Sequence, residues 1–119
     1  PNDLIPVYKR VAKQVSDWNQ EGQFVLVTGA TYPEELGEVR KIVGQMPLLV
    51  PGIGAQGGDV EAVLKLGLDQ EGQGLIISSS REILYAHEKS IKEPLANTKE
   101  LNEAGILARQ TRDLINKFR

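Results

Sequence analysis

The sequence predicts an α/β fold in which short parallel strands alternate with helices. Three short apolar runs, at 24–27, 48–50 and 75–77, are each followed by a loop and then by the start of a predicted helix. The runs are continuously apolar, as in strands that are covered on both faces of a parallel sheet. Because parallel strands need crossover connections, we expect each helix to link one strand to the next.

Length and composition exclude several classes of protein. The chain has 119 residues, 40% of them hydrophobic, which is the usual size of one domain. Its net charge is −2 with scattered basic residues, so we expect no nucleic-acid partner. It has no cysteine and no apolar run long enough to span a bilayer. We therefore expect a cytoplasmic protein with no disulfide and no membrane partner. A metal would need carboxylates or the single histidine as ligands.

The first predicted element is an amphipathic helix that ends near Gly22. Apolar residues recur there at spacings of three and four, so we expect them to form a buried stripe, with Trp18 in the core. The stripe consists of Leu4, Val7, Val11, Val15 and Trp18. A strand over about 24–29 follows, and its apolar run predicts burial on both faces.

The second helix is predicted to begin near Thr31. Thr31 and Glu34 have the spacing of a capping box, and Pro33 is tolerated in a first turn. The buried stripe of this helix consists of Leu36, Val39, Ile42 and Val43. A strand over about 48–51 then leads into a glycine-rich loop, after which Asp59 is the expected N-cap of a third helix. The stripe of that third helix consists of Val60, Val63, Leu64 and Leu66.

The last predicted unit begins with a strand over about 74–78. Ser79 and Glu82 offer a second capping box for the helix that follows it. We expect 91–97, which contains Pro94, to be a connector, and a final helix to begin near Lys99. The stripe of the final helix consists of Leu101, Ala104, Ala108, Thr111, Ile115 and Phe118.

Three strands are too few for a closed barrel, which needs about eight. The chain also begins with Pro1 where a complete protein begins with methionine. We therefore expect residues 1–119 to be one segment of a larger domain.

The loop after the second strand has the composition of a binding loop. Residues 51–59 include four glycines, among them Gly52, Gly54 and Gly57, which let a backbone come close to a ligand. Gln56 is the one large polar side chain there, and its amide can donate to a phosphate oxygen or pair with a base edge. In α/β folds ligands sit at the C-terminal ends of the strands, where this loop is expected.

The segment Ser78–Arg81 lies where the third strand becomes a helix. The free N–H groups of a first helical turn point at this place, and Arg81 adds a guanidinium that can hold two phosphate oxygens. Taken alone, such a glycine loop is more often a tight turn, and such a serine run is more often a helix cap. Their expected position on neighbouring strands favours a joint anion site.

Other polar and aromatic residues have simpler interpretations. His87 is expected on the surface, because it lies about one turn into the helix and points away from the strand ends. Tyr32 and Tyr85 are expected to be packing residues with a polar tip. Lys41, Lys65 and Lys92 are expected to be solvated.

Three segments, 29–36, 49–59 and 76–81, resemble in order and spacing the last three strand–loop–helix units of orotidine 5′-monophosphate decarboxylases. The most specific part is the string from Pro51 to Asp59, which reads proline-glycine-isoleucine-glycine-alanine-glutamine-glycine-glycine-aspartate. The resemblance is to the longer bacterial and archaeal subfamily in particular, and it covers nearly the whole chain.

The resemblance implies the C-terminal part, about three βα units, of a TIM barrel. The enzyme would convert orotidine monophosphate to uridine monophosphate and CO2 without metal or organic cofactor, as a homodimer. Gln56 and Arg81 match the family's phosphate-binding residues, with the backbone at Ser80 and Arg81 completing the phosphate site. Pro51 would shape the pocket mouth. Ser78 departs from the asparagine that is common in the family, with little expected consequence.

The family's decarboxylating array of lysine and aspartate residues has no counterpart in this chain. We therefore expect no catalytic residue here, no turnover by this chain alone, and a requirement for the N-terminal part of the barrel. Two alternatives remain open at this point. One is another phosphate-binding barrel, such as a pentulose-phosphate epimerase or a hexulose-phosphate synthase. The other is a non-enzymatic phosphate- or nucleotide-binding α/β module, which predicts a polar outer edge on the first strand.

Overall fold

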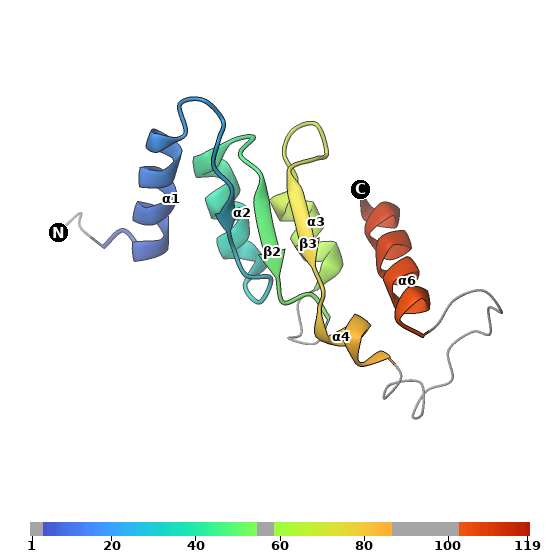
Figure 1. The fold of residues 1–119 in the computed structure, drawn as a ribbon. Coiled ribbons are helices and arrows are strands. Elements are labelled where there is room, and N and C mark those ends of the chain that lie inside the picture. The colour runs from blue at the N-terminus through green and yellow to red at the C-terminus, as the bar shows by residue number, and fades with distance from the viewer. Residues whose placement is uncertain (1–3, 55–58, 87–102) are drawn as a thin grey trace.

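The computed structural model describes residues 4–54, 59–86 and 103–119, and Figure 1 shows their arrangement. Helices and strands alternate through most of the chain. They are α1 (Val7–Trp18), β1 (Leu26–Val27), α2 (Pro33–Val43), β2 (Leu48–Pro51), α3 (Val60–Gly67), β3 (Leu75–Ser78), α4 (Arg81–Leu84) and α6 (Glu103–Phe118). The α/β class that the sequence predicts is confirmed.

The three strands form one parallel sheet in the order β1-β2-β3. In register, Leu26 pairs with Leu48 and Leu48 with Leu75, so chain order and spatial order agree. Each crossover contains one helix, α2 between β1 and β2 and α3 between β2 and β3. This is the repeated βα unit of parallel α/β folds, the barrels among them.

One face of the sheet is covered by helices and holds the core. Leu48 and Val50 of β2 are fully buried, and they pack with side chains of α2 and α3. The stripe predicted for α2 is confirmed, since Leu36, Val39 and Val43 are all buried. Figure 1 shows α1, α2 and α3 side by side along the sheet.

The other face of the sheet is uncovered. Side chains alternate between the faces of a strand, and Val27, Leu49 and Ile76 form one row across the sheet in register on this face. Val27 is 62% exposed and Ile76 is 50% exposed. Burial of the first strand on both faces was therefore a wrong prediction for this chain, because nothing in its described part covers the second face.

The apolar stripe predicted for the first helix is also largely exposed. Val7, Val11 and Trp18 are exposed. Val15 of the predicted stripe does pack against the core, together with Tyr8 and Ala12, which lay outside the predicted stripe. The placement of Trp18 in the core is wrong, since the side chain is 57% exposed at the end of α1. The outer apolar residues of α1 have no partner element among the described residues.

The predicted caps have mixed outcomes. Asp59 caps α3, with its Oδ1 accepting a hydrogen bond from the Ala62 N–H at 3.2 Å. At α2 the N-cap is Tyr32, with no side-chain capping bond, so the capping box at Thr31 was wrong. Pro33 does occupy the first turn of α2. Tyr32 is 65% exposed and Tyr85 is 56% exposed, so neither is a packing residue in this chain.

The described part of the final helix, α6, spans Glu103–Phe118, and the predicted start at Lys99 lies outside the described residues. Its buried residue is Leu107, next to the predicted Ala108, which is exposed. The predicted connector 91–97 and the residues Lys92 and His87 lie outside the described residues. Of the helices that the structure describes, none is both long enough and apolar enough to cross a bilayer.

Candidate functional site

The loops that follow the three strands meet at one end of the sheet. Pro51 is the register partner of Ser78, so the glycine-rich loop and the serine turn leave the sheet side by side. The Ala30 N–H donates to the Pro51 carbonyl oxygen at 3.0 Å, which joins the loop after β1 to the same edge. The adjacency that the sequence predicts for the two loops follows directly from this register.

Pro51 and Ser78 also point to the uncovered face. They lie two residues beyond Leu49 and Ile76, and residues two apart share a face of a strand. In a barrel this face is the interior, and its C-terminal end is where ligands bind. Pro51 is therefore placed where a residue shaping a pocket mouth would have to be.

Positive φ angles in the glycine loop show why it needs glycine. Gly52 has φ 91° and Gly54 has φ 81°, a region that side chains with a Cβ atom avoid. Between them, Ile53 is only 4% exposed and anchors the loop in the core. Gln56 and Gly57, which the sequence assigns to ligand binding, lie outside the described residues.

The serine turn presents its basic residue to solvent. Ser80 and Arg81 are exposed, and the Arg81 guanidinium forms no ion pair or hydrogen bond with another described residue. The helix behind it, α4, has only four residues, so its dipole contributes much less to anion binding than the sequence predicts. The guanidinium is thus the main source of positive charge at this turn.

The capping box predicted at Ser79 does not form as expected. The N-cap of α4 is Ser80, without a side-chain capping bond, and the buried Ser79 hydroxyl oxygen has no hydrogen-bond partner in the described structure. A buried hydroxyl without a partner costs free energy. Glu82, the expected partner, extends toward the glycine loop: a Cβ atom built on Gly54 would lie 2.1 Å from Glu82 Oε2.

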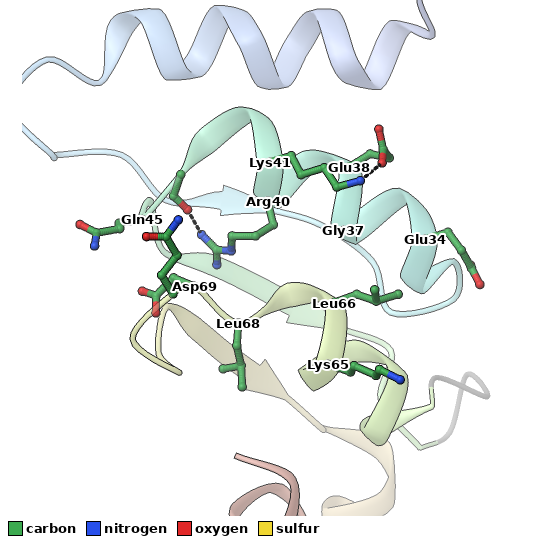
Figure 2. Close-up of a pocket in the computed structure, with 12 residues that line it drawn as sticks. Glu34, Gly37, Glu38, Arg40, Lys41, Gln45, Lys65, Leu66, Leu68 and Asp69 are labelled. Carbon is green, nitrogen blue, oxygen red and sulfur yellow. Dashed lines mark hydrogen bonds and ion pairs between the residues drawn. The ribbon is translucent and has the colours of Figure 1, made fainter.

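A separate groove of about 700 Å³ lies between α2 and α3, away from the strand ends just described (Figure 2). Its most unusual residue is Arg40, which is 7% exposed and which sequence analysis missed. The guanidinium donates to four carbonyl oxygens. They are those of Gly67 at 2.6 Å, Gly44 at 2.6 Å, Met46 at 2.7 Å and Gly74 at 2.9 Å.

The surroundings of Arg40 are structural rather than ligand-binding. Burial lowers the pKa of Arg40 from its ordinary value, and the nearby Asp69 carboxylate opposes that shift. Gly44 and Met46 lie just before β2, Gly74 lies just before β3, and Gly67 ends α3. The N-terminal ends of the strands are where barrels keep residues for stability. One sequence signal could have indicated its burial: Arg40 lies four residues after Leu36 and three before Val43, on the buried stripe of α2.

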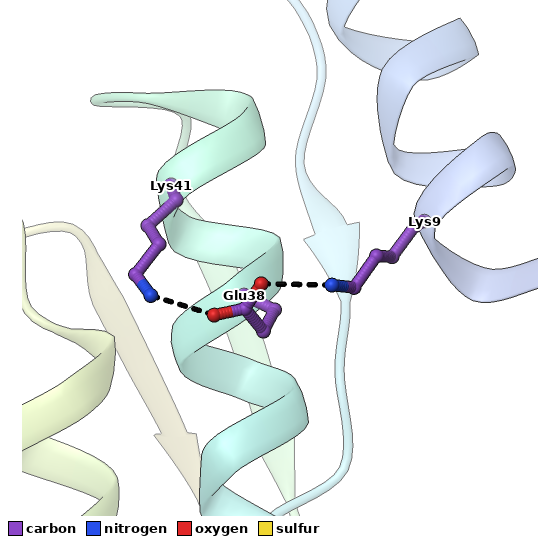
Figure 3. A network of polar contacts seen from close by, with 3 residues as sticks. All are labelled: Lys9, Glu38 and Lys41. Carbon is purple, nitrogen blue, oxygen red and sulfur yellow. Dashed lines mark hydrogen bonds and ion pairs between the residues drawn. The ribbon is translucent and has the colours of Figure 1, made fainter. Parts of the chain in front are cut away.

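A second polar cluster joins α1 to α2 (Figure 3). Glu38 accepts from the Lys9 ammonium at 2.8 Å and from the Lys41 ammonium at 2.6 Å. The hydrogen bonds from Lys41 and Lys9 lower the pKa of Glu38 from its ordinary value of 4.5 to about 2. This cluster lies on the helices and holds two of them together, so we do not include it in the site.

A third hollow, of about 520 Å³, runs between α1 and the outer edge of β1. Val7, Val11 and Val27 line it, together with Tyr32. Its walls are the exposed apolar residues already described, and the backbone edge of β1 beside it has no neighbouring strand in the described sheet. The hollow therefore marks an open edge of the sheet rather than a closed pocket.

The curated proteins that are most informative for comparison carry the same name. No protein-family model matches the chain. Among curated proteins, it is 51% identical over 115 residues to orotidine 5′-phosphate decarboxylase of Ralstonia pickettii, a match over 96% of this chain and 40% of that protein. It is 52% identical over 114 residues to the protein of the same name in Azoarcus sp., covering 95% of this chain and 39% of that protein. The chain thus spans about two fifths of the curated relatives' length.

Solved structures agree in fold. The match with a Leishmania donovani UMP synthase covers 94% of this chain and 22% of the synthase chain, with a TM-score of 0.76 and 33% sequence identity. The match with a Leishmania donovani OMP decarboxylase covers 97% of this chain and 39% of the decarboxylase chain, with a TM-score of 0.75 and 29% sequence identity. Over nearly all of its length, the chain is thus homologous to a C-terminal portion of orotidine 5′-phosphate decarboxylases.

Proposed function

We propose that this chain is the phosphate-binding portion of an orotidine 5′-monophosphate decarboxylase, which forms uridine monophosphate and CO2 in pyrimidine synthesis. The observation that carries the proposal is the pair of loops leaving adjacent strand ends, joined by the register of Pro51 and Ser78. About half of the residues are identical to those of proteins with this name. The alternative of a self-contained binding module is disfavoured by the apolar, uncovered face of its sheet.

The proposed roles follow from chemistry and position. Arg81 binds two phosphate oxygens through its exposed guanidinium, and the backbone at Ser80 and Arg81 donates to a third. Gln56 donates its amide to the phosphate from the opposite loop. Glycines 52, 54 and 57 allow that loop to approach closely, and Pro51 borders the pocket. Neither a metal nor an organic cofactor has a role in this proposal.

The phosphate does not react, but its binding energy can still accelerate the reaction. Contacts to a remote group can close a loop and hold the reacting base in place, so that the transition state is favoured. The lysine and aspartate residues that decarboxylate the base would come from a preceding part of the barrel. In this proposal, that part covers the open face of the sheet, and the complete protein is a cytoplasmic homodimer.

The role of Arg81 can be tested in the complete protein that carries this chain. Arg81→Ala should weaken binding of uridine monophosphate by about 10- to 100-fold, as expected for losing a charge-assisted bidentate contact, and leave uridine binding unchanged. Arg112→Ala, at an exposed arginine on α6, is the matched control. An equal loss for nucleotide and nucleoside would contradict the assigned role.

The reaction itself is tested by the loss of orotidine monophosphate absorbance. We expect the complete protein to consume this substrate, and the 119-residue chain alone to leave it unchanged. A complete protein that bound sugar phosphates tightly without decarboxylating orotidine monophosphate would contradict the proposed function.

A further inference from the structure

Glu82 connects the two loops of the candidate site. A Cβ atom built on Gly54 would lie 2.1 Å from Oε2 and 2.5 Å from the carboxyl carbon of Glu82. The carboxylate therefore fills the space beside the Gly54 Cα atom. Gly54 belongs to the loop after β2, and Glu82 belongs to α4 after β3, so the side chain extends from one strand end to the next.

The short helix that carries Arg81 depends on such contacts. α4 has four residues, and its N-cap makes no side-chain capping bond. A helix of one turn has little stability of its own, because the conformational entropy lost in forming the first turn exceeds the free energy gained from its hydrogen bond. The position of Arg81 therefore depends on what holds α4. Among the described residues, α4 packs against α6, and Glu82 contacts Gly54.

Two features favour glycine at position 54: the contact with Glu82 and the positive φ angle of the backbone. Its φ of 81° already disfavours other residues. A side chain at this position would in addition displace the Glu82 carboxylate. The glycine thus permits the Glu82 carboxylate to lie close to the loop backbone.

We propose that Glu82 is a positioning residue that fixes the glycine loop relative to Arg81, so that a substrate phosphate meets both in one arrangement. This inference rests on the proposed function. The negative charge of Glu82 repels a phosphate, so its benefit comes from ordering the two loops in advance of binding. Glutamine has the same shape without the charge, which makes it the conservative replacement.

The test compares three variants of the complete protein. Glu82→Ala should weaken binding of uridine monophosphate about tenfold, leave uridine binding within about twofold, and leave the midpoint of thermal unfolding unchanged. Glu82→Gln should restore nucleotide binding to within about threefold of the parent. Glu61→Ala, which removes an exposed carboxylate in the first turn of α3, should behave as the parent.

A double variant tests the contact itself. Gly54→Ala should weaken nucleotide binding, and the combined Gly54→Ala and Glu82→Ala variant should lose less than the two single losses together, because both disturb one contact. Strictly additive losses would overturn the proposal.

Three other outcomes would also overturn it. Unchanged nucleotide binding by Glu82→Ala would show that the contact has no role, and equal losses for nucleotide and nucleoside would show a general structural role. Tighter nucleotide binding by Glu82→Ala would show that the carboxylate competes with phosphate. If the parent protein binds nucleotide no better than nucleoside, it is the proposed function that fails.

Discussion

Arg40 shows how much one buried side chain can hold together. Its guanidinium bonds to carbonyl oxygens after α2, at the end of α3 and before β3. A buried carbonyl left without a donor costs about 1–3 kcal/mol. The arginine therefore stabilises the fold by donating hydrogen bonds to carbonyl groups of several segments at once. An arginine suits the task because its planar group presents five donors in fixed directions.

Replacement of Arg40 should therefore destabilise the protein, even by lysine. Arg40→Lys keeps the charge but offers donors from one atom, which cannot reach all four carbonyls, and we expect a loss of about 3 kcal/mol in the free energy of unfolding. Urea denaturation of the complete protein measures it. Arg112→Lys, at an exposed arginine, should change stability by less than about 0.5 kcal/mol. A similar small change for Arg40→Lys would show that the carbonyl network is dispensable.

At the scale of the elements, the ion pair between Lys9 and Glu38 joins α1 to α2 and should make that contact depend on pH. The pKa of Glu38 is lowered to about 2, so the group binds protons more weakly in the folded protein than in the unfolded chain. Its stabilising contribution is therefore complete above pH 4.5 and is lost as the pH falls toward 2.

The prediction compares the parent with Glu38→Gln by urea denaturation at several pH values. The variant should be less stable than the parent at pH 7, and the difference should disappear between pH 4.5 and about 2. High salt should reduce the difference at pH 7, because the groups are partly exposed. A difference that stays constant down to pH 2 would mean that the ion pairs do not carry the effect.

The same elements show what sequence periodicity can predict. The stripe of α2 and the Asp59 cap follow from local spacing and were correct, because their partners lie within the helix or on the adjacent strand. Periodicity places Arg40 on the buried stripe of α2, but its hydrogen-bond partners could not be derived, since two of its acceptors, Gly67 and Gly74, are distant in sequence. The capping box at Thr31 failed because α2 begins at Pro33, so the N-cap is the next residue, Tyr32.

At the scale of the whole molecule, three of the wrong burial predictions share one cause. Trp18, Val27 and Tyr32 have the sequence pattern of covered residues, but they are exposed in this chain. All three belong to the first helix, the first strand or the loop after it, beside the unpaired edge of the sheet. The pattern fits the length of the curated relatives: this chain matches about two fifths of that length, and about three fifths of it lies outside the match.

This common cause predicts fragment complementation. The part of the Ralstonia pickettii relative that precedes the matched region, produced separately, should bind this chain by adding a parallel strand beside β1 and covering the row of Val27, Leu49 and Ile76. Mixing the two parts should generate decarboxylation of orotidine monophosphate, which neither part shows alone. Analytical ultracentrifugation measures the binding separately from the activity.

Charged replacements on the uncovered face and on α1 beside the edge of β1 make the prediction specific. Val27→Lys and Val11→Glu should each weaken the association about tenfold or more, because a charge would be buried against apolar surface. Gln70→Lys adds a charge on the exposed turn before β3, away from that face, and should associate as the parent does. If the two parts bind equally well with Val27→Lys, the strand does not dock beside β1. If they bind and remain inactive, the docking surface stands while the proposed activity fails.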